Sequence, residues 1–275
     1  MTTSTQLKAK IRNVSQTTGV EAEVVLRNFM MERLLERIST SEYRDNFILK
    51  GGLLIASMVG IDIRSTMDMD TTVKGRQVGE DEIVSMIKDI IDVPVDDNVT
   101  LSYKGVREIR EEADYPGFRI SLEAALGKTR QTLKVDITAG DFVTPNEIEY
   151  SYSLMFEDRA IRILAYNTET VLAEKFETII TRGVANTRMR DFYDVYILTA
   201  TQSFDDGTFR DALGNTISKR GSARQMGAPG TVIETVATNS TMSGLWQRYQ
   251  SRNSYAAGVS WRSAIDALYG LAKLL

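Results

Sequence analysis

Two aspartates separated by one residue are the part of this 275-residue sequence best suited to do chemistry. Asp68 and Asp70 lie in the segment DMDTTV, residues 68–73, whose alternating pattern predicts a strand. Side chains two positions apart on a strand point to the same face, so the two carboxylates should be neighbours. Divalent cations such as Mg²⁺ take one or two carboxylates together with substrate phosphates. The pair therefore predicts magnesium-assisted phosphate chemistry.

A pair of glycines precedes these aspartates. The apolar run 47–49 predicts a short strand and the segment 53–60 a helix, with Lys50, Gly51 and Gly52 in a tight turn between them. Backbone N–H groups at such a turn can bind a phosphate. A lone glycine pair is commonly only a turn, and a lone Asp-x-Asp commonly lies on a solvated strand edge. Their conjunction is what indicates a site.

A third carboxylate is available at Asp136. It lies in LKVDITAG, residues 133–140, within a segment that predicts another strand. Its neighbours Val135 and Ile137 are apolar, and if they belong to the core, Asp136 must face the opposite side of the sheet.

A lysine at an apolar helix face is the next candidate. Lys175 shares a face of the helix predicted at 168–183 with Leu172 and Ile179. From there its ammonium group could reach triphosphate oxygens as a point charge. The ordinary alternative is a surface lysine that extends its charge into water.

Two more aspartates follow on the next predicted helix. Asp191 and Asp194 lie three positions apart and so face the same way. An ion-pair network with Arg188 and Arg190 is a fair alternative to a catalytic role.

The composition excludes several classes of enzyme. The sequence has no cysteine and no histidine, which rules out disulfides, thiolate metal sites and hydrolases that use a serine-histidine or cysteine-histidine pair. Acid or base chemistry must fall to carboxylates, lysine or tyrosine. The net charge of −4 argues against a protein that coats nucleic acid by bulk charge. The sequence has no signal-peptide pattern and no apolar run near the roughly 20 residues that cross a bilayer, so we expect a cytoplasmic protein without a membrane partner.

The elements that must position these residues indicate an α+β fold, in which a mixed sheet with flanking helices is followed by a helical C-terminal part. We expect two domains, residues 1–165 and 166–275, and a linker at the Gly-, Ala- and Ser-rich segment 214–230. The helices are expected at 7–14, 21–39, 53–60, 80–92, 168–183 and 191–200, and the strands at 47–49, 68–73, 99–109, 117–125 and 132–137.

Taken in order, these motifs resemble the AbiEii/AbiGii toxin family of nucleotidyltransferases, the toxin half of the AbiE abortive-infection systems of bacteria. The similarity extends over residues 34–198 and rests on LKGG with RSTMDMD, then LKVDI, LAEK and RDFYD. It implies a polymerase-beta-like fold, a nucleoside triphosphate substrate, Mg²⁺ as cofactor and a separately encoded antitoxin in a type IV arrangement.

The resemblance also implies roles for individual residues. Asp68 and Asp70 would be catalytic and would bind the metal with Asp136 near them, while Lys175 and Asp191 would be the catalytic residues of the later motifs. The residues expected to bind the nucleotide are Lys50, Gly51, Gly52, Arg64, Ser65, Thr66, Asp136 and Asp194.

One departure from the superfamily pattern lies in the glycine pair. Many of these transferases carry Gly-Ser where this chain has Gly51-Gly52, so a hydroxyl that contacts phosphate is missing. Ser65 or Thr66 could replace it.

The acceptor is the least determined part of the expected reaction. Some relatives add nucleotides to the acceptor ends of tRNA and so block translation, which implies an RNA hydroxyl, with tRNA first, as the acceptor here. Its proton would pass to Asp136 or Asp191, and the sequence does not choose between them.

Two other functions fit parts of the sequence. One is a sensor or interaction protein of the same fold that holds a triphosphate without turning it over. The other is a DNA-binding helix-turn-helix at residues 5–40, where charges of both signs are mixed. Burial of Phe29, Met30 and Leu34 against the sheet explains that segment more simply.

Overall fold

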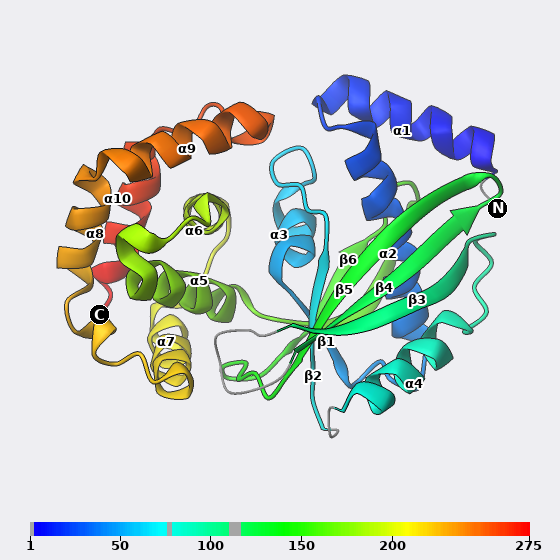
Figure 1. The fold of residues 1–275 in the computed structure, drawn as a ribbon, viewed down its shortest axis with the longest axis horizontal. Coiled ribbons are helices and arrows are strands. Elements are labelled where there is room, and N and C mark those ends of the chain that lie inside the picture. Colours follow the sequence, from blue (N-terminus) through cyan, green and yellow to red (C-terminus); the bar gives the residue numbers. More distant parts are fainter. Residues whose placement is uncertain (1–2, 76–78, 110–116) are drawn as a thin grey trace. The chain divides into compact units, whose positions relative to one another are not determined.

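The computed structural model describes residues 3–75, 79–109 and 117–275. The chain forms two compact units, whose elements are labelled in Figure 1. The first, here called the sheet unit, comprises Met1–Asp141 and Glu147–Tyr166, and the second, the helical unit, comprises Phe142–Asn146 and Asn167–Leu275. The chain therefore leaves the sheet unit for five residues before its last two strands return to it.

The sheet unit is built on one seven-stranded sheet within the described residues. The strands are β1 (Phe47–Lys50), β2 (Met69–Val73), β3 (Thr100–Ile109), β4 (Gly117–Leu126), β5 (Thr129–Ala139), β6 (Ile148–Ser153) and β7 (Ala160–Ala165). Their order is β3-β4-β5-β2-β1-β7-β6. β2 is parallel to β5 and β1 to β7, while the other neighbours are antiparallel. This mixed sheet confirms the expected α+β class.

The two faces of the sheet differ in composition. On β4, Ile120 and Leu122 are fully buried and the positions between them are partly exposed. β5 repeats this alternation with Leu133, Val135 and Ile137 in the core. Because side chains alternate along a strand, one face packs into the core and the other collects the polar residues.

Helices cover the apolar face. The helices of the sheet unit are α1 (Ser4–Thr18), α2 (Ala22–Thr40), α3 (Gly51–Val59) and α4 (Glu80–Ile91). α2 packs on β5 and β7, and α4 packs on β3 (Figure 1). α2 is buried at every position from Asn28 to Ile38, so this stretch offers no free face to a DNA groove. The helix-turn-helix interpretation of residues 5–40 is therefore not supported.

The helical unit is a bundle with an aromatic core. Its helices are α5 (Thr168–Arg182), α6 (Met189–Thr201), α7 (Asp206–Arg220), α8 (Pro229–Thr238), α9 (Ser240–Arg252) and α10 (Trp261–Ala272). α5 begins where the Asn167 side chain accepts a hydrogen bond from the Thr170 N–H at 2.8 Å. It packs against α6 and α7, and α6 packs against α10. Phe176, Tyr193 and Trp246 are buried at the centre of this unit.

Most of the predicted elements are present, with ends that differ by a few residues. The two apolar helices of the N-terminus, the helix at 80–91 and the strands at 47–50, 69–73, 100–109, 117–126 and 129–139 all occur. The glycine pair does not form a separate turn, because α3 begins at Gly51 directly after β1.

Two features were missed or misjudged. The strands β6 and β7 were not predicted; β6 is an edge strand that buries only Tyr152, so its sequence shows little apolar alternation. The predicted linker at 214–230 is too long: α7 continues into it to Arg220, and only residues 221–228 connect α7 to α8. The buried side chains of Leu213 and Thr216 hold that helix in place despite the glycine-rich composition.

None of the helices in the described part of the chain is long and apolar enough to cross a membrane.

Candidate active site

The junction between β1 and α3 brings an aspartate to the start of a helix. The N–H of Gly52 donates to Asp70 Oδ2 at 3.3 Å. Gly51 has φ +66°, and a Cβ at this position would overlap the Asp70 carboxylate. Glycine is therefore required both for the backbone conformation and for the space that the carboxylate occupies. The positive end of the α3 dipole favours the negative charge placed there.

The second glycine is packed against a hydroxyl. A Cβ on Gly52 would lie 2.5 Å from Thr66 Oγ1 and 3.2 Å from Arg64 Nη2. Thr66 Oγ1 donates to the Asp68 carbonyl at 3.2 Å, and the buried Arg64 donates to the Ser65 carbonyl. The structure thus brings the hydroxyl of Thr66 next to Gly52, the position at which the resemblance leads one to expect a serine.

Asp68 and Asp70 flank a fully buried residue. Met69 between them is in the core, whereas both aspartates are partly exposed. Asp68 lies one residue before β2 and Asp70 is its second residue. The pair sits at the beginning of the strand, close to the first turn of α3.

Asp136 lies beside Asp70 on the polar face. The two residues are directly in register between the parallel strands β2 and β5. Val135 and Ile137 are fully buried, so Asp136 points away from the core as expected. Registered neighbours share a face of the sheet, which places the two carboxylates side by side.

Asp136 has a partner that the sequence did not reveal. Arg119 on β4 binds it with two hydrogen bonds, one of which joins Nε to Oδ1 at 2.5 Å. The hydrogen bonds to Asp136 raise the pKa of Arg119, and the charges of Asp68 and Asp70 raise it further, so the guanidinium stays charged. The position between the apolar Phe118 and Ile120 could have marked Arg119 as a residue of the polar face.

The carboxylates fit a magnesium ion in part. Among the described residues, no three carboxylates are close enough to form a ready-made metal site. Asp68 and Asp70, the latter seated in the space that Gly51 leaves, match the one or two carboxylates that Mg²⁺ takes beside substrate phosphates. Asp136 would have to exchange Arg119 for the metal, so its role as a ligand stays a prediction.

Lys50 extends the same row of residues. It is in register with Asp70 across β1 and β2. Its ammonium group lies 2.6 Å from Asp141 Oδ2 and 5.8 Å from the centre of the Tyr166 ring. Asp141 also accepts a hydrogen bond from Thr138 Oγ1 at 2.7 Å. Asp141 was not singled out from the sequence, because it follows the end of β5 and no strand alternation marks its face.

In the helical unit, Lys175 forms a triad with two aspartates. Its Nζ lies 2.8 Å from Asp191 Oδ1 and 2.8 Å from Asp194 Oδ2, and the three side chains are largely buried. This arrangement excludes the solvated surface lysine. The ion-pair alternative holds for the aspartates, but their partner is Lys175.

The triad fixes the charge of the lysine. Burial lowers the pKa of Lys175, but the charges and hydrogen bonds of Asp191 and Asp194 outweigh it, so the net shift is upward. A lysine with a raised pKa contributes stability that is lost only as the pH rises through that value. Lys175 is therefore charged at neutral pH and cannot serve there as a general base.

The predicted residues thus form two groups, one in each unit. The sheet unit holds Lys50, Gly51, Gly52, Arg64, Ser65, Thr66, Asp68, Asp70 and Asp136, and the helical unit holds Lys175, Asp191 and Asp194.

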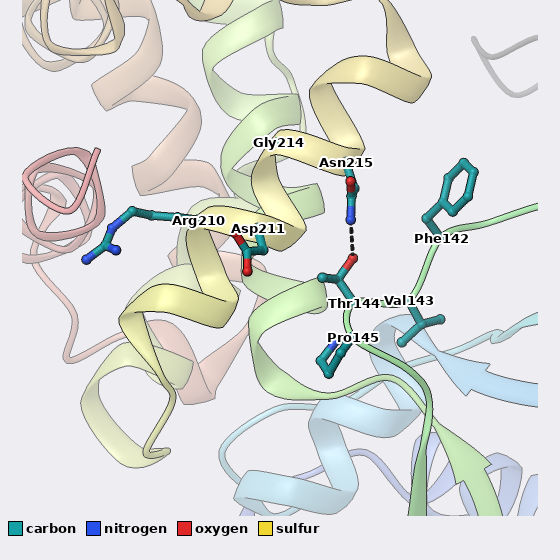
Figure 2. Close-up of a pocket in the computed structure, with 8 residues that line it drawn as sticks. All are labelled: Phe142, Val143, Thr144, Pro145, Arg210, Asp211, Gly214 and Asn215. Carbon is teal, nitrogen blue, oxygen red and sulfur yellow. Dashed lines mark hydrogen bonds between the residues drawn. The ribbon is translucent and has the colours of Figure 1, made fainter.

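A separate open cavity lies within the helical unit. It has a volume of about 530 Å³ and lies between residues 142–145 and α7. Figure 2 shows Asn215 donating to Thr144 Oγ1, a hydrogen bond of 2.9 Å that ties the segment to α7. None of the residues predicted to be functional lines this cavity.

Most of the chain matches a known protein family. A family model described as "Nucleotidyl transferase AbiEii toxin, Type IV TA system" matches residues 33–267. No curated protein matches the sequence significantly.

A solved structure shares the fold. The crystal structure of JHP933 from Helicobacter pylori is 14% identical, with 93% of this chain and 92% of that chain covered and a TM-score of 0.55. An antigenic nucleotidyltransferase-like protein from Paracoccidioides brasiliensis is 12% identical, with 81% and 92% covered and a TM-score of 0.34. At such identities the likeness to JHP933 concerns the fold alone.

Proposed function

The chain belongs to the AbiEii family of nucleotidyltransferase toxins of type IV toxin–antitoxin systems, and from this premise we propose its substrates and the roles of its residues. The protein is a nucleotidyltransferase, and its family implies a nucleotide substrate and an antitoxin partner. We propose that it moves a nucleotide from a nucleoside triphosphate to the 3′ hydroxyl of an RNA, with tRNA as the acceptor, and that this reaction arrests growth.

The observation that carries the proposal is the approach of Asp70 to the start of α3. Gly51 leaves the space that this carboxylate fills, and Asp136 stands in register beside it. A carboxylate pair beside the N-terminal turn of a helix combines the two things that a triphosphate with Mg²⁺ needs.

We assign binding of Mg²⁺ to Asp68 and Asp70. When bound, the ion would neutralise charge on the triphosphate and on the departing pyrophosphate. Lys50, the first turn of α3 and Thr66 line the same end of β1 and β2, and we assign them to the phosphates. Such transfer depends chiefly on alignment and charge stabilisation, which explains why the chain can dispense with histidine.

The transfer makes one bond and breaks one. The 3′ oxygen of the acceptor bonds to the α-phosphorus, the bond from that phosphorus to the bridging oxygen breaks, and pyrophosphate leaves with the electron pair. The hydroxyl proton passes to a carboxylate, for which Asp136 and Asp191 are the candidates. Each is held by a cation, Asp136 by Arg119 and Asp191 by Lys175. Asp136→Asn and Asp191→Asn variants, compared over a pH series, discriminate between them.

The helical unit supplies the later family motifs. We propose that Lys175 provides a permanent positive charge for the phosphates and that Asp191 and Asp194 hold it in place. The triad geometry and the raised pKa of Lys175 support a positioned, always charged lysine.

The acceptor is tested by incubating the protein with labelled nucleoside triphosphates, Mg²⁺ and total RNA, followed by mass analysis of the purified tRNA. We expect one or more nucleotides added at the 3′ end, and no addition when the RNA ends have been oxidised with periodate. Labelled protein or small molecules with unlabelled RNA would refute the RNA acceptor. Tight triphosphate binding without any labelled product would instead identify a silent sensor.

A further inference from the structure

A row of charged residues crosses four strands of the sheet on the polar face. Arg107 on β3 is in register with Arg119 on β4, Arg119 with Asp136 on β5, and Asp136 with Asp70 on β2. Residues in register share one face of the sheet, so the two arginines and the two aspartates form one continuous row. Three strand spacings separate Arg107 from Asp70, or roughly 14 Å.

The neighbouring row on this face supplies another cation beside residues with small side chains. Gly105 is in register with Ser121, and Ser121 with Lys134 on β5. Val135 and Met69 are buried and in register between the parallel strands β5 and β2. Lys134 and Asp68 are the residues immediately before them. Lys134 therefore lies in the row that contains Asp68. On its other side, Ser121 and Gly105 have small side chains and leave the face open.

Among the described residues of this face, basic side chains outnumber acidic ones. Arg107 and Lys134 are exposed, and within the described part of the chain neither forms an ion pair. Farther along, Glu123 is neutralised by Lys104 at 3.2 Å and Arg130 at 2.9 Å. We call Arg107, Lys134, Lys104 and Arg130 the basic strip.

We propose that the basic strip binds the phosphate backbone of the RNA acceptor and leads its 3′ end to Asp68 and Asp70. This inference rests on the proposed function. A chain with a net charge of −4 does not attract a polyanion by bulk charge, so local cations must do so. The strip begins beside the carboxylates where the hydroxyl has to arrive.

The chemistry of the face favours a nucleic-acid backbone over a protein partner. Lysine, arginine and serine side chains are the usual phosphate contacts, and Ser121 and Thr132 accompany the cations here. Protein interfaces centre on apolar or aromatic anchors. Tyr103 of β3 is in register with the buried Leu122 and so belongs to the opposite face.

The test measures binding without nucleotide, by fluorescence anisotropy of labelled tRNA and of a labelled single-stranded RNA over a salt series. The variant is Arg107→Gln with Lys134→Gln. The control is Lys8→Gln with Arg12→Gln, which removes the same charge from exposed positions on α1 of the same unit. Circular dichroism and urea unfolding establish that both variants are folded.

We expect the strip variant to bind RNA at least tenfold more weakly and the slope of log K against log salt to fall by about 1.4, at roughly 0.7 for each lost contact with single-stranded phosphate. The control should bind like the wild type. In the transfer assay the strip variant should raise the KM for RNA and leave kcat near the wild-type value.

Equal RNA binding by the strip variant and the wild type, or an equal loss in the control, would overturn the inference. A strip variant that binds RNA normally but fails to bind the antitoxin would assign the face to the protein partner and overturn it as well. Because binding is measured without triphosphate, a wild type that binds RNA through the strip but transfers nothing would refute the proposed reaction and keep the inference.

Discussion

Gly52 and Thr66 are packed so closely that the side chain of Thr66 leaves no room for one at position 52. This chain has Gly51-Gly52 in place of Gly-Ser, and the hydroxyl of Thr66 occupies the space that a serine at position 52 would need. The two positions should therefore be coupled, since residues in direct contact show non-additive effects on stability.

Gly52→Ser should lower the free energy of unfolding by about 1–3 kcal/mol, the usual cost of overpacking. Adding Thr66→Ala should recover part of the loss, because the atom 2.5 Å from the new Cβ is removed. Urea unfolding measures both. Gly214→Ser is the control, because a Cβ at Gly214 would meet no atom within 4 Å. A Gly52→Ser protein as stable as the wild type would show that this packing is wrong.

The Lys175 triad gives a second prediction at this scale. Lys175→Met removes the cation that contacts both Asp191 and Asp194, which should cost about 3–5 kcal/mol of unfolding free energy. The triple variant with Asp191→Asn and Asp194→Asn should regain much of this, because the buried charges are gone. Thermal and urea unfolding of the two variants decide the matter. A loss below about 1 kcal/mol for Lys175→Met alone would contradict a buried, charge-balanced triad.

At the scale of the element, α2 is unusual in burying charged residues. Arg33 lies 3.1 Å from Glu36 and 2.6 Å from Glu157, and Arg37 lies 2.6 Å from Asp97. The pairs with Glu157 and Asp97 join α2 to the segments that follow β6 and α4. Glu32 also belongs to this group: its two oxygens accept from the backbone N–H of Met155 at 3.1 and 3.2 Å, and Arg33 lies 3.8 Å away.

Burial raises the pKa of Glu32 to about 8, against opposing effects of the Met155 hydrogen bond and Arg33; Glu157 and Glu36 raise it further. The folded state therefore keeps a proton that the unfolded chain loses near pH 4.5. Stability from this group is complete below that pH and falls as the pH rises toward 8. Glu32→Gln should thus stabilise the protein at pH 7 and above, measured by urea unfolding. An advantage that does not grow between pH 5 and 8 would contradict this.

The elements also show what the sequence could predict. Amphipathic helices can be predicted from the sequence, and so can strands whose residues alternate between buried and exposed, such as β4 and β5, because one face must be apolar. β6 does not, since an edge strand with one buried side chain lacks that pattern. The glycine-rich part of α7 looked like a linker because composition does not reveal which residues a tertiary contact will bury.

For the whole molecule, the family motifs are divided between two units. The sheet unit carries the glycine pair, Asp68, Asp70 and Asp136, and the helical unit carries Lys175 with its aspartates. The candidate site residues could be proposed from the sequence because their order in the chain is a family pattern. The pairing of Arg119 with Asp136 could not, since it arises from the register of β4 with β5, which brings residues 17 positions apart into contact.

The central claim is that Asp68 and Asp70 support transfer of a nucleotide. The most direct measurement supplies the protein with one nucleoside triphosphate labelled at the α-phosphate and, in parallel, at the γ-phosphate, with Mg²⁺ and total RNA. We predict that only the α-label enters RNA, that γ-label appears as pyrophosphate, and that Asp68→Asn and Asp70→Asn lower the rate by at least a hundredfold. Entry of γ-label into RNA, or transfer by both variants at the wild-type rate, would contradict the account.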